Sequence, residues 1–243
     1  EYDGEDLINW KDVDLDPDEI DNPVMEAGST LNSVFVAPKP VQKPHPQVWE
    51  PVSSPRSIKF AASRGINGYL TSGSPPLVNR LLDAYMDAVE EAGWPDYREE
   101  YDGEPFKFGW DGDRQRGMCP LRVVFNTDIV EEEAVDRFKA GLEHKYAFYG
   151  PFGINSAALD MGDDVPIDFQ PDADLLLEKK VAFIGDSEEL VDQIAQFKED
   201  CGFEDFIMDI GFDMSGISGD ETMDQMRTFA DEVMPYLREE FAA

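Results

Sequence analysis

Two patterns of hydrophobic residues alternate along this chain. Short apolar runs are followed by segments whose apolar residues recur every three or four positions. The short runs are typical of buried strands, and the spaced segments are typical of helices that bury one face. A strand followed by a helix, repeated, indicates βα units around a parallel sheet. We distinguish about four such units, and they predict an α/β fold.

The first two units follow a proline-rich stretch. A strand is expected over 48–52, then a helix that ends near Gly65, and a second strand over 68–71. Ser74 is expected to cap the next helix, with Pro75 in its first turn. The apolar faces of the two helices are expected to be Ile58, Phe60, Ala61 and Ala62 in the first, and Val78, Leu81, Leu82, Tyr85 and Val89 in the second.

The later units are separated by polar excursions. Strands are expected over 121–126, where apolar and other residues alternate, over 181–185, and over 206–210. Segments 95–118 and 155–180 are rich in glycine or aspartate and are predicted to be loops or insertions. The intervening helices should bury Phe138, Leu142 and Tyr146, then Leu190, Ile194, Phe197 and Cys201 after a cap at Asp186 or Ser187. The last helix should bury Met223, Met226, Phe229, Ala230, Val233 and Leu237.

A serine-rich turn follows the first strand and offers the clearest candidate chemistry. Four prolines between residues 38 and 46 keep the approach extended and prevent a helix. Ser53, Ser54 and Ser57 then lie where a helix begins, and the start of a helix presents unpaired N–H groups to an anion. The sequence therefore predicts a phosphate site, although Ser54-Pro55 is also an ordinary helix cap that needs no ligand.

The stretch 38–57, PKPVQKPHPQVWEPVSSPRS, resembles the fifth strand and phosphate loop of the luciferase-like, flavin-dependent monooxygenases. Residues 2–5 (YDGE) with 10–13 (WKDV), and 233–237 (VMPYL) near the other end, are also similar to that family. The resemblance implies a (β/α)8 barrel, of which 1–243 would be the C-terminal part, with strands five to eight and an extended entry over 1–46. Half a barrel leaves strand edges and an apolar inner face bare, so the other half is expected before Glu1 and this part alone is expected to be inactive.

The resemblance also assigns candidate site residues. Val52 through its backbone, and Ser53, Ser54 and Ser57, would hold the flavin phosphate, whereas Arg56 is expected to be solvated. Gly211 and Phe212, at the end of the last strand, are a weaker hypothesis for the substrate pocket, because they are equally ordinary turn and packing residues.

No catalytic residue can be named within this chain. The family's catalytic histidine and phosphate-binding arginine would belong to the missing part. His45 in the proline-rich connector is interpreted as structural and His144 as a rim residue. Metal sites are not predicted: the histidines lack ligand spacing, and the acidic segment 14–19 lacks the glycine and glutamate of a calcium loop.

The function implied by the resemblance is oxygenation of a small organic substrate by reduced FMN and O₂ through a flavin hydroperoxide, with a separate reductase supplying the reduced FMN. The two polar excursions would be candidate lids. A deazaflavin-dependent hydride transfer enzyme of the same superfamily is the alternative. A non-catalytic flavin-binding relative is the alternative from another class, because fold does not fix function.

Charge and cysteine content limit the partners. With 20 Lys and Arg against 53 Asp and Glu, the formal net charge is −33. Such a chain is repelled by nucleic acid and by anionic membranes, so neither is an expected partner. Cys119 and Cys201 are too few for a disulfide scaffold, which suggests a reducing cytoplasm. Whether the chain forms a homo-oligomer is left open.

Overall fold

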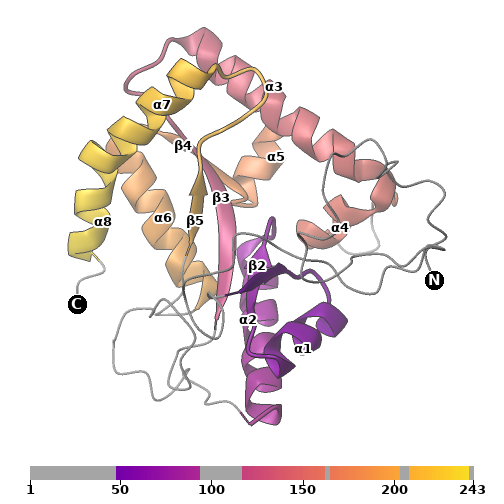
Figure 1. Ribbon diagram of the computed structural model, residues 1–243. Coiled ribbons are helices and arrows are strands. Elements are labelled where there is room, and N and C mark those ends of the chain that lie inside the picture. The colour runs from indigo at the N-terminus through magenta and orange to yellow at the C-terminus, as the bar shows by residue number, and fades with distance from the viewer. Residues whose placement is uncertain (1–47, 94–116, 162–164, 203–207, 241–243) are drawn as a thin grey trace, which may run out of the picture. The chain divides into compact units, whose positions relative to one another are not determined.

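One parallel β-sheet organises the residues described by the computed structural model, 48–93, 117–161, 165–202 and 208–240 (Figure 1). These residues fall in the unit 47–243, so the extended entry expected over 1–46 lies outside them, as does most of the loop expected over 95–118. The strands are β1 (Trp49–Pro51), β2 (Asn67–Leu70), β3 (Met118–Asn126), β4 (Ala182–Gly185) and β5 (Asp209–Gly211).

Helices follow the strands, as the alternation of patterns predicted. They are α1 (Pro55–Ser63), α2 (Pro75–Glu91), α3 (Glu132–Tyr149), α4 (Ile154–Ala158), α5 (Ala173–Glu178), α6 (Ser187–Cys201), α7 (Gly219–Thr228) and α8 (Met234–Glu240), with a 3-10 turn η2 (Gly150–Phe152) and a π-helical segment η4 (Phe229–Val233). Helices α4 and α5 show that the segment 155–180 is not all loop. The α/β prediction is confirmed, and no helix in the described ranges has the length and apolarity to cross a membrane.

Local sequence signals set where the helices begin. Ser54 caps α1: its Oγ accepts from Ser57 N, and Ser57 Oγ in turn accepts from Ser54 N at 3.2 Å. Asp186 and Glu189 form the same reciprocal capping box at α6. Ser74 precedes α2 as predicted, but its side chain makes no capping bond. Pro75 and Pro76 bring no N–H to the first turn.

The order of the strands differs from that of a barrel in one place. Strands β1 to β4 are neighbours in chain order and all pair in parallel, whereas β5 pairs with β3 instead of extending the sheet beyond β4. Val123 pairs with Ala182 of β4 and with Gly211 of β5, so these two strands lie on opposite edges of β3. Each of the five segments expected to be strands overlaps one, which is one more than strands five to eight of a barrel allow, and the sequential order expected for those strands ends at β4.

The length of β3 explains this arrangement. Strand β2 pairs only with residues 118–120 of β3, which leaves the same edge of β3 open from Leu121 onward. Unpaired backbone groups in a buried strand are costly. Strand β5 pairs with Leu121–Val123 and satisfies them.

Hydrophobic side chains pack on both faces of the sheet. One cluster joins α1, α2, α6 and η4 to Met118 and Val124 of β3, and the other joins α3 and α5 to Val123 and Phe125. Figure 1 shows α6 to α8 on one side of β3, with α3 and α5 on the other. The bare inner face expected of half a barrel is therefore covered over β3 and β4.

Four hydrophobic residues expected in the core are exposed, Ala230 among them. Phe60 is 45% exposed, Met223 46% and Met226 45%. The Phe60 ring instead lies under the Arg64 guanidinium, whose carbon is 3.8 Å from the ring centroid. Ala61 and Ala62 are buried in α1 as expected, and Gln225 is buried in α7 although it was not expected to be. The sequence-based expectation thus assigned too many residues to the buried faces of these helices.

The carboxyl end of β3 is fixed by a buried polar clamp. Gln225 accepts from Asn126 N at 2.6 Å and donates to Asn126 O at 2.8 Å. The Asn126 side chain donates to Ser187 Oγ at 2.9 Å and accepts from Asp128 N at 2.7 Å. The clamp joins α7 and α6 to the end of the strand, and it explains why two amide side chains are buried here.

Gly141 allows α3 to approach the segment that follows β5. A Cβ at this position would lie 2.1 Å from Ser215 O and 2.7 Å from Met214 Cγ. The contact with backbone leaves no flexible atom to move aside. This close approach fixes the face of α3 that carries Leu142 and Lys145.

We expect Gly141→Ala to lower the free energy of unfolding by about 1–3 kcal/mol, because the added methyl group overpacks this contact. The matched control is Gly219→Ala, since a Cβ at Gly219 meets no atom within 4 Å. Urea denaturation measures both variants. Equal stability of the two variants would contradict the close approach of α3.

Candidate functional site

A cavity of about 370 Å³ opens where β1 and β2 end. Residues 51–53 and 69–72 supply one part of its wall, and residues of α3 and α4 supply another. In α/β sheets, ligands bind outside the carboxyl ends of parallel strands. The volume falls within the range of small-molecule sites, about 300–1,000 Å³.

Most of the lining is apolar, with a few hydroxyl groups. Ser53, Thr71 and Ser72 bring hydroxyls, and Tyr69, Tyr146 and Tyr149 bring aromatic rings. Such a surface suits a flat organic ring that carries a small number of polar groups. The apolar side chains that complete the lining are Val52, Leu70, Leu77, Leu81, Ile154, Ala157 and Ala158.

Two of the tyrosines are held by hydrogen bonds. Tyr69 donates to Asp209 Oδ2 at 2.6 Å, which joins β2 to β5, and the hydroxyls of Tyr146 and Ser72 are 2.7 Å apart. Burial raises the pKa of both tyrosines, and the Asp209 carboxylate raises that of Tyr69 further. Both therefore stay neutral at physiological pH and act as hydrogen-bonding groups.

Arg122 supports the turn after β2 from beneath. Its side chain is fully buried, donates to Leu121 O at 2.6 Å and to Gly73 O, and lies 4.2 Å from the Phe197 ring centroid. Burial lowers its pKa to about 10, so the guanidinium remains charged at neutral pH. Because it binds Gly73, it fixes the position of Thr71 and Ser72 in the cavity wall.

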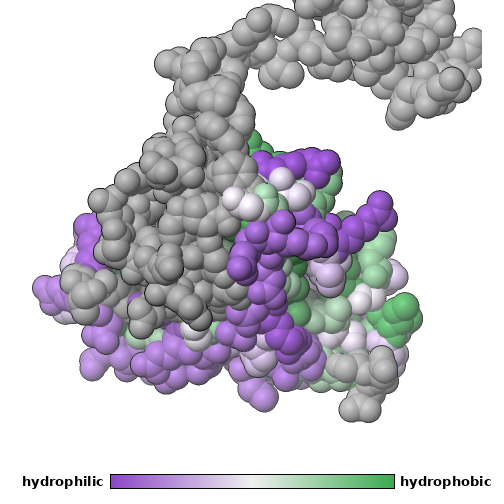
Figure 2. Space-filling model, turned by 90° about the horizontal axis from the view of Figure 1, so that it is seen from below, coloured by the Kyte–Doolittle hydropathy of each residue, from purple (hydrophilic) through white to green (hydrophobic). Residues whose placement is uncertain are grey.

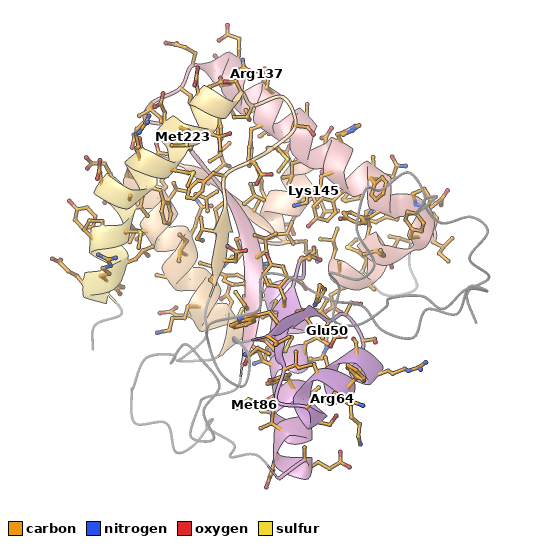
Figure 3. The ribbon with its side chains drawn as sticks, viewed as in Figure 1. Glu50, Arg64, Met86, Arg137, Lys145 and Met223 are labelled. Carbon is orange, nitrogen blue, oxygen red and sulfur yellow. The ribbon has the colours of Figure 1, made fainter. Side chains whose placement is uncertain are left out.

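Lys145 is the one charged residue among the described residues that line the cavity. It extends from α3 toward the sheet (Figure 3). Its ammonium group makes no hydrogen bond or ion pair with another described residue. Burial lowers its pKa, and the charge of the nearby Asp213 opposes that shift.

Asn155 brings a buried amide to the same cavity. Its Nδ2 donates to Tyr146 O and Phe169 O, both at 2.9 Å, which ties α4 to the end of α3. Its Oδ1 is buried and has no hydrogen-bond partner. A buried acceptor without a donor is costly, so Asn155 carries an unsatisfied group beside the cavity.

The predicted phosphate residues lie partly in the cavity and partly beside it. Val52 and Ser53 line it. Ser54 and Ser57 do not line it, and they bond to each other in the capping box of α1. Ser53 N also donates to Ser57 Oγ, at 3.3 Å. The exposed serines of the helix cap thus continue directly from the cavity wall.

The other candidate residues lie apart from the cavity. Gly211 and Phe212 do not line it, and Phe212 packs edge-on against Phe229 with ring centroids 5.3 Å apart. This contact belongs to the hydrophobic core, which favours the packing interpretation of Phe212. His144 is exposed on α3, Arg56 is exposed on α1, and His45 and segment 14–19 lie outside the described residues.

Sequence reasoning missed the part of the cavity that α3 and α4 contribute. A signal for Lys145 was present: it follows Phe138 and Leu142 at helical spacing and precedes Tyr149, so a lysine interrupts an apolar stripe. Tyr69, Thr71 and Ser72 could have been found as the end of the second strand. Asn155 carried no local signal, because its role depends on the contact between α4 and α3.

Comparisons with known proteins show similarity of fold. The sequence matches none of the protein-family models and none of the curated proteins with which it was compared. Among solved structures, the monooxygenase RslO1 from Streptomyces bottropensis is 19% identical with a TM-score of 0.51, over 82% of this chain and 51% of that one. The oxygenating constituent of 3,6-diketocamphane monooxygenase from Pseudomonas putida, in complex with FMN, is 16% identical with a TM-score of 0.55, over 79% and 49%.

A third similar structure is the EDTA monooxygenase from Chelativorans sp., 16% identical with a TM-score of 0.50, over 91% of this chain and 50% of that one. The chain thus spans about half the length of the structures that it matches. In fold, it resembles the luciferase-like flavin monooxygenases, as the motifs of its sequence predicted.

Proposed function

We propose that this chain is the flavin-holding part of a luciferase-like oxidoreductase, a monooxygenase that uses reduced FMN and O₂ to oxygenate a small organic substrate. The observation that carries the proposal is the cavity at the ends of β1 and β2, whose wall passes through Ser53 into the exposed serines of the α1 cap. A ring could occupy the apolar part while its phosphate meets the helix start.

The cavity fits the flavin ring in chemical terms. Its tyrosines and aliphatic side chains suit a flat aromatic system. The similar diketocamphane monooxygenase contains FMN. When bound, the flavin would supply the redox chemistry. This chain would bind the phosphate, orient the ring and exclude water, and a separate reductase would supply the reduced cofactor.

The proposed fold of the whole enzyme is a (β/α)8 barrel, of which this chain is about half. Strands β1 to β4 have the order of neighbouring barrel strands. The position of β5 beside β3 and that of α3 over the second face are two departures of this chain from that plan.

Deazaflavin-dependent hydride transfer is the rival activity on the same scaffold. Both cofactors carry a phosphate and a tricyclic ring, so the cavity and the serine turn serve either. Visible absorption of the cofactor that co-purifies with the protein distinguishes them. A chain that binds FMN but, when reduced, consumes no O₂ would instead be a non-catalytic flavin-binding relative.

We expect the full chain to bind FMN about tenfold or more tightly than riboflavin, because a hydrogen bond to a charged group contributes about 1.5–3 kcal/mol. Ser53→Ala leaves the mutual cap of Ser54 and Ser57 in place and should reduce this preference. Quenching of flavin fluorescence measures both dissociation constants. Ser63→Ala, at the other end of α1, is the matched control.

Two results would oppose the phosphate site. Equal affinity of the wild type for FMN and riboflavin would show that this turn does not bind the flavin phosphate. If Ser54→Ala lowered the melting temperature without changing the preference for FMN, the serines would serve only as a helix cap, which contributes about 1 kcal/mol.

We expect Phe212→Ala to lower the free energy of unfolding by about 1–3 kcal/mol while leaving FMN affinity unchanged, because Phe212 packs on Phe229 away from the cavity. Phe152→Ala is the control, since Phe152 is 65% exposed. Urea denaturation and flavin titration measure the two effects. Weaker FMN binding by a folded Phe212→Ala protein would show that Phe212 does contribute to the pocket.

A further inference from the structure

The cavity carries a positive charge in a strongly negative protein. The chain has a formal net charge of −33, and hydrophilic residues cover much of the described surface visible in Figure 2. Among the described residues that line the cavity there is no carboxylate, and the single charged side chain is Lys145. The charge on the cavity wall is therefore positive, whereas the net charge of the protein is negative.

The position of Lys145 costs free energy that this part of the chain does not recover. Its ammonium group is partly withdrawn from water, yet no described residue accepts a hydrogen bond from it. Other lysines in the described ranges, such as Lys139 and Lys180, pair with aspartates. A cation moved from water without a partner is destabilising, and a lysine side chain is flexible enough to reach solvent if nothing held it.

The helix geometry keeps Lys145 on the cavity side. Gly141, one turn earlier on the same face, packs against the Ser215 backbone, and Tyr146 next to it bonds to Ser72. Asp213, on the connection after β5, attracts the ammonium charge but forms no ion pair with it. Lys145 thus lines the cavity without an ion-pair partner among the described residues.

We propose that Lys145 binds an anionic group, a carboxylate or a group of similar charge, on the organic substrate of this cavity. The substrate is then an apolar, flat or compact body with one negative end. Tyr146 and Tyr149, on the same helix as Lys145, contact the body beside the flavin ring. The ammonium group of Lys145 pairs with the anion in a partly dehydrated setting, where such a bond is strong. This inference rests on the proposed function for the identity of the ligand as a substrate.

The test uses two probes that share one ring, 1-naphthoate and its neutral amide, 1-naphthamide. We expect the full chain to bind 1-naphthoate more tightly than 1-naphthamide. Lys145→Met should lower the affinity for 1-naphthoate about tenfold to a hundredfold and change the affinity for 1-naphthamide by less than about twofold. Lys145→Arg should keep much of the affinity for the anion. Fluorescence of the naphthyl ring reports binding of both probes.

Lys139→Met is the matched control, because it removes the same charge from the same helix at a position that does not line the cavity. An equal loss of 1-naphthoate affinity in the Lys139 and Lys145 variants would overturn the proposal, since the effect would be one of net charge. Loss of both probes in Lys145→Met would also overturn it, because Lys145 would then only shape the cavity wall.

Titration of the same variants with FMN and riboflavin separates the two possible sources of the anion. If Lys145→Met weakens the binding of FMN but not that of riboflavin, the anion that Lys145 binds is the cofactor phosphate, and its assignment to the substrate is wrong. If the wild type binds neither flavin while 1-naphthoate still depends on Lys145, the proposed function fails and the anion site stands.

Discussion

Strand β3 brings many polar groups into the interior, and much of the described structure follows from how they are satisfied. Arg122 Nε is an exception, since it is buried without a partner. Eight of its nine residues are buried, including Arg122 and Asn126. Its backbone is paired by β2, β4 and β5 in turn, and its last residue is held by Gln225. Each buried polar group without such a partner would destabilise the fold by about 1–3 kcal/mol.

The same requirement builds the cavity. Arg122 has no carboxylate partner among the described residues, so its donors go to the backbone, and the acceptor at Gly73 fixes the turn that ends in the cavity wall. The Tyr69 bond to Asp209 places β5 beside β2 along the edge of β3. The ends of β1 and β2 are therefore positioned by groups beneath them, which is what a preorganised site needs.

Helix α3 completes the site because it crosses to the second face of the sheet. Its Phe138 ring stacks on Phe125 at a centroid distance of 4.6 Å, and Gly141 brings it against the segment after β5. From that position it contributes a lysine and two tyrosines to the cavity. Hydroxyl groups thus line one wall of the cavity and an ammonium group lines another.

The sequence by itself determined what local rules control. The parallel α/β alternation, the caps at Ser54 and Asp186 and the turn at Gly65 follow from periodicity and from side chains that bond to their own backbone. Val52 and Ser53 were singled out because a strand end and a helix start meet there, and both line the cavity, whereas their contact with a phosphate stays a prediction.

Only the tertiary structure decided the remainder, because it depends on contacts between residues far apart in the chain. The pairing of β5 with β3 follows from an edge that a short β2 leaves open, and no feature of residues 209–211 alone encodes it. The exposure of Met223 and Met226, and the arrival of Lys145 and Asn155 at a cavity formed by β1 and β2, depend on how α7, α3 and α4 pack. Periodicity tells which side of a helix is buried, but the partner that buries it is chosen by the whole fold.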